Sequence, residues 1–201
     1  MRNKVELVLG TSLDKNHKYF LECAQIHSDV IPTGFLPRLG LDFLSSLYRG
    51  FSKSKYSFLV LAVENSRVVG FMAVSLNTKT FFKQYLLTQA FKDIFRIPIS
   101  IFGKVFLGKV LEVLKYPFYD KANQDHFVSN SEIFNFCVIK GMQGRGVGQL
   151  LFSDAVIRLG DNGVEILKIV TGQSQVGAQR FYYKCGARLS HKIMVHQGEE
   201  S

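Results

Sequence analysis

The sequence predicts an α/β protein in which helices flank a central sheet. In the second half of the chain, β-rich runs alternate with helical patterns in the order strand, glycine loop, helix, strand, helix, strand. The first half supplies three further β-rich runs and two helical patterns. Because strands separated by helices tend to pair in parallel, we expect some parallel pairing. The 201 residues suffice for one hydrophobic core, so we expect a single domain over 1–201.

The first half is expected to form three strands and two helices. Asn65-Ser66 is a turn signal between two apolar runs and predicts a hairpin there. Both helices fall between the first strand and the second, joined by a stretch rich in turn formers. The expected strands are Val5–Leu9, Tyr56–Val63 and Arg67–Leu76, and the expected helices are Asp14–Ile26 and Leu41–Phe51.

A helical insertion is expected at about 77–127, before the next strand. The stretch FFKQYLLTQAFKDIF repeats apolar residues at helical spacing, and Pro98 stops or kinks that run. A second helical pattern follows and is closed by Pro117. This arrangement is typical of a helical pair inserted between two strands.

The second half is expected to begin and end with a strand. Its first strand runs directly into a glycine-rich loop, and a helix starts at the end of that loop. The expected strands are Ile133–Val138, Val164–Thr171 and Arg188–Val195, and the expected helices are Gly148–Leu159 and Gln175–Lys184.

Composition and charge exclude several classes of protein. With 47% hydrophobic and 20% charged residues, the chain is typical of globular rather than disordered proteins. Its formal charge of +9 favours acidic partners such as a phosphorylated small molecule. The three cysteines match no zinc or disulfide spacing, so we expect free thiols and no metal. No signal peptide or membrane-spanning run is evident, so a cytoplasmic location is expected.

The loop after Val138 reads IKGMQGRGVGQLL and brings four glycines into eight residues. Missing side chains let a ligand approach the backbone, and the following helix directs its positive end at the same place. The spacing Gly144-x-Gly146-x-Gly148 does not fit the dinucleotide fingerprint G-x-G-x-x-G. A Walker A loop is excluded too, because Lys140 precedes the glycines. The loop suits a pyrophosphate, although a plain strand–helix connection remains the alternative at this point.

Two sequence signatures narrow this choice. Gln143-Gly-Arg-Gly146-Val-Gly148 fits Q/R-x-x-G-x-G/A and resembles the acetyl-CoA pyrophosphate loop of the GNAT N-acetyltransferase superfamily. Ala178-Gln-Arg-Phe-Tyr182-Tyr-Lys184-Cys-Gly186 resembles the second signature of that superfamily, A-x-x-x-Y-x-K-x-G. The two are separated by room for a helix, a strand and a helix. The resemblance implies a GNAT-like mixed sheet flanked by helices, with the helical insertion placed before the acetyl-CoA-binding strand.

The resemblance also implies a seat for acetyl-CoA as co-substrate. The pantetheine arm is expected to pair as an extra strand with the backbone of Cys137, Val138 and Lys140. Gln175 stands where many members carry a cofactor-binding Asn, so whether Gln175 makes the same contact with the cofactor stays open. The pyrophosphate is expected on the loop amides of Gln143, Gly144, Arg145, Gly146, Val147 and Gly148.

For catalysis, the resemblance assigns Tyr182 as the general acid that protonates the leaving thiolate. Val138 N–H is the corresponding candidate for stabilising the oxyanion. Glu132 precedes Gln143 by 11 residues, the offset of the glutamate base in the histone-acetylating branch. His196 and a water-mediated route are alternatives for the base. Cys137 lacks a neighbouring His and acid in the sequence, which favours a buried small residue over a nucleophile.

The acceptor is expected to be a small-molecule primary amine that attacks directly in a ternary complex. The stretch FLPRLGLDFLSSLYRGF, joined to the helical insertion, resembles GNAT members of sugar-modification pathways, which implies an amino sugar, nucleotide- or lipid-linked. A protein or peptide amine and a non-catalytic CoA-binding regulatory module are alternatives. Between Lys79 and Lys115 there are seven basic and two acidic residues, which suits peripheral contact with an anionic membrane, a lid over an acidic substrate, or a homodimer contact. No nucleic-acid-binding motif is present.

Overall fold

The computed structural model describes residues 4–13, 17–32, 35–90, 129–190, 194–196 and 199–200. The chain divides into two compact units, Met1–Lys168 and Ile169–Ser201. Each unit is described by itself below. The single domain expected over 1–201 stays a prediction.

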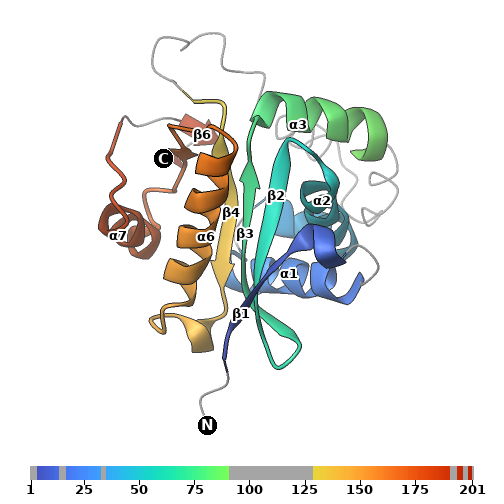
Figure 1. Ribbon diagram of the computed structural model, residues 1–201, viewed down its shortest axis with the longest axis horizontal. Helices are drawn as coiled ribbons and strands as arrows, with labels where there is room; N and C mark the ends of the chain where they lie inside the picture. Colours follow the sequence, from blue (N-terminus) through green and yellow to red (C-terminus); the bar gives the residue numbers. More distant parts are fainter. Residues whose placement is uncertain are drawn as a thin grey trace. The chain divides into compact units, whose positions relative to one another are not determined.

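A five-stranded mixed sheet forms the centre of the fold, in the order β1–β2–β3–β4–β5. Figure 1 labels the first four of these strands. Three successive pairs, β1–β2, β2–β3 and β3–β4, are antiparallel. β4 and β5 are joined through a helix, which is the connection that parallel neighbours need. The strands are β1 (Glu6–Leu9), β2 (Ser57–Glu64), β3 (Arg67–Ser75), β4 (Glu132–Val138) and β5 (Lys168–Ile169).

The turn between β2 and β3 confirms the predicted hairpin. Asn65 and Ser66 both adopt positive φ, 51° and 61°, as the two central residues of a type I′ turn do. Asparagine tolerates this left-handed conformation better than most residues, because its short side chain can hydrogen-bond locally.

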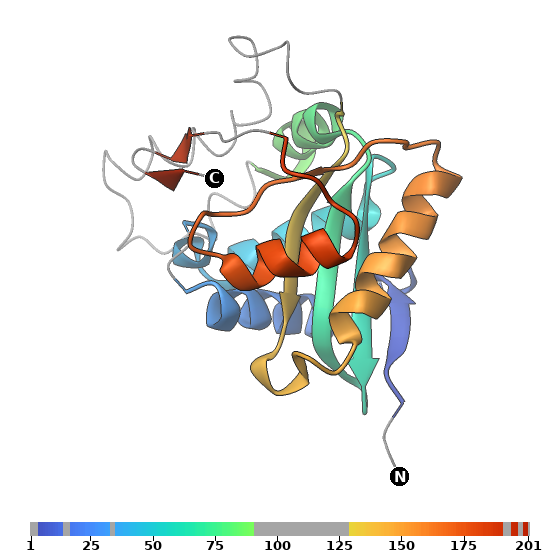
Figure 2. The same ribbon diagram turned by 90° about the vertical axis from the view of Figure 1, so that its left-hand side faces the viewer.

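Helices cover both faces of the sheet in the first unit. α1 (His17–Val30) and α2 (Leu41–Lys53) lie on one face, and α6 (Val147–Asp161) lies on the other (Figures 1 and 2). Short 3₁₀ segments, η1 (Gly10–Leu13) and η2 (Leu36–Leu39), precede α1 and α2. This layering is the α/β architecture that the alternation of strands and helices predicts.

The main core lies between the sheet and the α1–α2 layer. Tyr48 and Phe51 of α2 are fully buried, and Tyr48 contacts Phe71 of β3 edge-on with ring centroids 4.7 Å apart. Phe51 also contacts Phe81 and Phe134 at 4.1 and 5.1 Å between ring centroids. The α1–α2 layer therefore fixes the position of β4 through large aromatic side chains, which dominate core energetics.

The start of the predicted insertion is helical, as expected. α3 (Thr78–Tyr85) begins at Asn77, whose side chain accepts a hydrogen bond from Thr80 N–H at 3.0 Å, and a π-helical turn, η3 (Leu86–Ala90), follows. Phe81, Phe82 and Tyr85 are buried and anchor this helix to the core. The remainder of the insertion, including its second helical pattern and most of its basic residues, lies outside the described residues.

The two last predicted strands are shorter than expected. Of Val164–Thr171, only Lys168–Ile169 is paired as β5, and Val164–Leu167 is irregular. In the second unit, α7 (Val176–Lys184) confirms the predicted helix, whereas Arg188–Ser190 is irregular and β6 (Met194–His196) pairs with β7 (Glu199–Glu200). In the part of the chain that the structure describes, no helix is both long and apolar enough to cross a membrane.

A buried polar cluster, defined by His27, Tyr48, Asn135 and Cys137, interrupts the core. His27 Nδ1 lies 2.6 Å from the Tyr48 hydroxyl, and Asn135 Nδ2 lies 3.3 Å from both ring nitrogens of His27. The Cys137 thiol donates to Asn135 Oδ1 at 3.3 Å. The cluster connects α1, α2 and β4. No sequence pattern indicated it, because its members are spread over 110 positions of the chain.

Burial lowers the pKa of His27 from 6.5 to about 4, because the imidazolium would lose its hydration inside the core. The folded protein thus excludes a proton that the unfolded chain takes up below about pH 6.5. The unfolding free energy should fall as the pH drops from 6.5 towards 4, by about 2 kcal/mol at pH 5 from this residue. Urea denaturation at pH 7, 6 and 5 measures it.

His27→Gln should remove most of this pH dependence, while His17→Gln, an exchange at an exposed histidine, should retain it. An equally steep decline in the His27 variant would show that another group is responsible.

Candidate active site

β4 is paired along its whole length on one side only. β3 pairs with it from Glu132 to Val138, interrupted by one bulge. On the other side its neighbour β5 has two residues, and the hydrogen bond between Lys168 N–H and Ser131 O lies just before β4 begins. β5 is therefore too short to follow β4 to its end. Within the described part of the first unit, no other strand pairs with this outer edge of β4.

The backbone groups on the outer edge can be assigned from the register. Ile139 N–H donates to Val69 O, so the pair 69–139 is hydrogen-bonded. Hydrogen-bonded and non-hydrogen-bonded pairs alternate along an antiparallel ladder. The pair Gly70–Val138 is therefore non-hydrogen-bonded, and so is Met72–Phe136. The N–H and C=O groups of Phe136 and Val138 point to the outer edge.

This alternation corrects one predicted contact. Cys137 is the partner of Phe71, and its backbone N–H and C=O face β3 rather than the outer edge. Phe136, which the sequence reasoning did not select, takes its place. Burial also raises the pKa of the Cys137 thiol to about 12, so the thiolate that a nucleophile needs is not available. Cys137 is a buried core residue.

The glycine loop connects β4 to α6 through a 3₁₀ turn, η6 (Lys140–Met142). Gly144 and Gly146 adopt positive φ, 72° and 86°, a conformation that glycine takes without steric cost. A Cβ at either position would meet no atom of the described residues within 4 Å. Within that part of the chain, the space above both glycines lets a ligand approach the main chain.

The helix end at this loop has no side-chain cap. Gly146 is the N-cap of α6 and has no side chain to cap the helix, and the first intrahelical bond runs from Leu150 N–H to Gly146 O. The N–H groups of Val147 and Gly148 thus lack helical acceptors, as first-turn amides do. Arg145 and Lys140 are exposed beside them. Free amides, the positive helix end and two cations suit an anion such as a pyrophosphate.

Gln143 connects the loop back to β4. Its side-chain amide Nε2 donates to Val138 O at 2.9 Å. Val138 O lies on the outer edge of β4, so this bond occupies an acceptor on the edge that the loop adjoins. The loop amides and the outer edge are therefore held in one structural unit.

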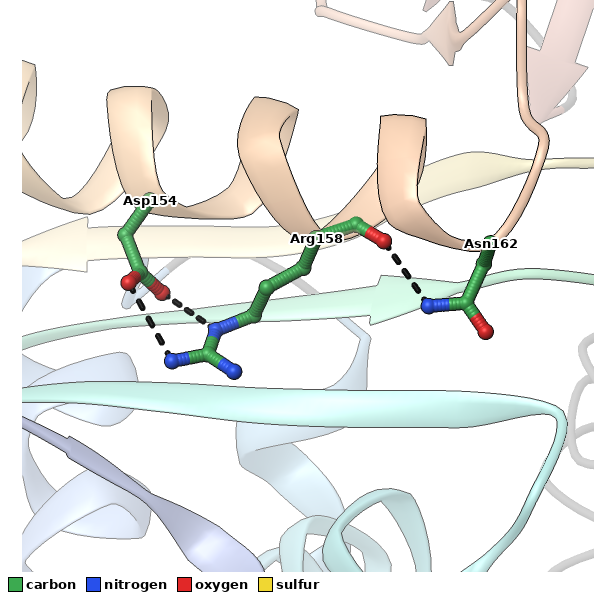
Figure 3. Close-up of polar contacts among 3 residues, drawn as sticks. All are labelled: Asp154, Arg158 and Asn162. Atoms are coloured by element: carbon green, nitrogen blue, oxygen red, sulfur yellow. Dashed lines mark hydrogen bonds and ion pairs between the residues drawn. The ribbon is translucent and has the colours of Figure 1, made fainter.

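α6 has one buried face along its length and a set of side-chain hydrogen bonds near its C-terminus. Val147, Leu151, Ala155 and Leu159 form its buried face, and Leu151 packs near Gly70, where an added Cβ would lie 3.0 Å from Cys137 O. Near its C-terminus, Arg158 binds both carboxylate oxygens of Asp154, at 2.6 and 3.2 Å (Figure 3). Asn162 Nδ2 donates to Arg158 O at 2.8 Å and caps the helix (Figure 3). The uncapped N-terminus thus belongs to a helix whose opposite end is capped and whose one face is buried.

Glu132 lies at the start of β4 and is almost completely buried, with 4% of its surface exposed. Its carboxylate Oε2 lies 3.0 Å from Lys168 Nζ of β5. The preceding residue, Ser131, donates its hydroxyl to Leu76 O at 2.7 Å, and Ser129 donates to Ile166 O. The sequence analysis makes Glu132 a candidate base, but only the structure shows that its carboxylate forms an ion pair with Lys168.

The second unit contains the other two predicted site residues. Tyr182 lies on α7, is 7% exposed and contacts Phe181 edge-on at 5.4 Å between ring centroids. Gln175 is the N-cap residue of α7, and its Oε1 accepts a hydrogen bond from Gly172 N–H at 3.3 Å. The Gln175 side chain therefore stabilises its own loop. The roles of both residues towards a cofactor stay predictions.

Comparison with known proteins agrees with this geometry. Residues 103–187 match the model of the Acetyltransferase (GNAT) family, a segment that includes β4, the glycine loop, α6 and α7. No curated protein matches the chain.

Several solved structures share the fold at low sequence identity. The aminoglycoside N-acetyltransferase AAC(6')-Iy in complex with CoA is 12% identical with a TM-score of 0.59, and the alignment covers 96% of this chain and 94% of that one. An aminoglycoside acetyltransferase from an uncultured soil metagenomic sample is 14% identical (TM-score 0.52, coverage 96% and 97%). A transcriptional regulator from Bacillus halodurans C-125 is 16% identical (TM-score 0.57, coverage 95% and 97%). Similarity at this level shows the fold alone.

Together, the family match and the fold show what the chain is similar to. Residues 103–187 are similar to the acetyltransferases of the GNAT family, as the two sequence signatures predict, and the chain shares the fold of solved N-acetyltransferases. The regulator among the similar structures shows that this fold also carries other functions.

The ion pair between Glu132 and Lys168 can be tested through stability. Lys168→Met removes the ammonium group from a buried carboxylate and should lower the unfolding free energy by about 3 kcal/mol. The double variant Glu132→Gln with Lys168→Met should lose much less, because no unpaired charge remains. Urea denaturation of the three proteins measures both values. A loss below about 1 kcal/mol in Lys168→Met would contradict a buried ion pair of this strength.

Proposed function

We propose that the protein transfers an acetyl group from acetyl-CoA to a primary amine by direct attack in a ternary complex. The observation that carries this proposal is the uncapped, glycine-lined start of α6 directly after the outer edge of β4. The family match over the same segment supports it.

The cofactor is proposed to bind along this continuous surface. The pyrophosphate accepts hydrogen bonds from the amides of the Gln143–Gly148 loop, and Arg145 adds positive charge. The pantetheine arm pairs with the outer edge of β4 at Phe136 and Val138, with Lys140 at its end. Backbone amides suit this task because they are rigid donors already oriented by the sheet.

The proton transfers are assigned to two side chains. Tyr182 is the proposed general acid that protonates the departing CoA thiolate, and Val138 N–H stabilises the oxyanion of the tetrahedral intermediate. Glu132 is the proposed acceptor of the amine proton, acting from an environment that also contains the Lys168 ammonium group. His196 and a water-mediated route are the alternatives for that step.

The acceptor proposed first is an amino sugar. Two proteins of similar fold are aminoglycoside acetyltransferases, which makes aminoglycosides and free amino sugars the natural first panel. Protein or peptide amines form the second panel. The insertion is proposed to contact the acceptor, an anionic membrane surface or a second copy of the chain.

Tyr182→Phe should lower kcat by about 10- to 100-fold and leave the affinity for CoA unchanged, because only the transferable proton is lost. Thiol release from acetyl-CoA with the amine panel measures kcat, and calorimetric titration with CoA measures the affinity. Tyr183→Phe, the same change at the exposed neighbour, serves as the control.

If CoA binds but no amine of either panel is acetylated, the protein is instead a CoA-binding regulatory module. An unchanged kcat in Tyr182→Phe would show that another group is the general acid.

A further inference from the structure

Gln143 is the first residue of the first sequence signature, and in the structure its side chain contacts β4. The signature itself only indicates that this residue begins the pyrophosphate loop. In the structure its Nε2 donates to Val138 O at 2.9 Å, across five positions of the chain. The side-chain amide is thus directed at the strand that precedes the loop.

The hydrogen bond completes the fixation of one peptide group. The C=O of that group belongs to Val138 and accepts from Gln143, and its N–H belongs to Ile139 and donates to Val69 O at 3.0 Å. One peptide plane is therefore held from the loop on one side and from β3 on the other. Because this plane is fixed, the backbone rotation at Val138 is restricted as well.

We propose that Gln143 is a positioning residue that fixes Val138 on the outer edge of β4 for acetyl transfer, and that its side chain does not serve to hold the pyrophosphate. This inference rests on the proposed function, in which Val138 N–H stabilises the oxyanion. A donor that is held in place in advance is worth more than one that must be ordered during the reaction.

The same bond restricts how the cofactor binds. Val138 O already accepts a hydrogen bond from Gln143, so an amide of an arriving pantetheine arm finds this acceptor engaged. The loop and the strand thus form one site, in which displacement of either part misplaces the oxyanion donor.

Two acyl donors separate positioning from pyrophosphate binding. S-acetyl-pantetheine carries the reacting thioester and lacks the pyrophosphate, whereas acetyl-CoA has both. Gln143→Met keeps the length of the side chain and removes its donor. It should lower kcat about 3- to 10-fold with both acyl donors, the range expected for one hydrogen bond.

Two variants serve as controls. Gln25→Met removes an amide hydrogen bond of the same length, 2.9 Å to Asp29, from an exposed position on α1, and should leave both reactions unchanged. Arg145→Ala should raise the KM for acetyl-CoA and leave the KM for S-acetyl-pantetheine unchanged. A Gln143→Met variant that behaves like Arg145→Ala, with a higher KM for acetyl-CoA and normal turnover of acetyl-pantetheine, would overturn the proposal. So would normal turnover with both donors.

A second measurement needs no turnover and no ligand. In the free protein, amide hydrogen exchange of Ile139 followed by NMR should be about 3- to 10-fold faster in Gln143→Met and unchanged in Gln25→Met. Unchanged exchange at Ile139 would overturn the proposal even if the chain proved to be an enzyme. Faster exchange together with an absence of acetyl transfer from wild type would leave the fixation of Val138 intact and refute the proposed function.

Discussion

The one-sided pairing of β4 is the constraint on which the site depends. β3 satisfies one edge of the strand from Glu132 to Val138, and β5 reaches only its start, where Lys168 N–H bonds to Ser131 O and Lys168 Nζ pairs with Glu132. The outer edge of a strand is a template for another extended chain. In the proposed function, that chain is the pantetheine arm of the cofactor.

The elements around β4 hold this edge in place. On one face, Phe134 packs against the α2 aromatic Phe51, and Asn135 joins the buried polar cluster with His27. On the other face, α6 packs close to Gly70, where an added methyl group would press against Cys137 O. Because every side of the strand except its outer edge is engaged, the loop after it begins at a defined point. The positive start of α6 comes directly after this loop.

Much of the fold and part of the site could be predicted from local signals in the sequence. The rest depends on contacts between residues far apart in the chain. The hairpin at Asn65-Ser66, the glycine loop and the helix after it were predictable, because each depends on neighbouring residues. The sequence did not show that the backbone groups of Phe136, rather than those of Cys137, face the outer edge of β4. That assignment follows from the register with β3. The cation opposite Glu132 lies 36 positions further along the chain, and the His27–Asn135 contact spans 108. The signature at Gln143 did not indicate that its side chain binds Val138 O.

A crystal structure with acetyl-CoA bound would test the proposed cofactor site. We expect the pyrophosphate on the amides between Gln143 and Gly148, the pantetheine arm along Phe136 and Val138, and the thioester oxygen within hydrogen-bond distance of Val138 N–H. The Gln143 side chain should still donate to Val138 O. A cofactor bound away from the outer edge of β4, or a thioester directed away from Val138, would rule out the proposed site.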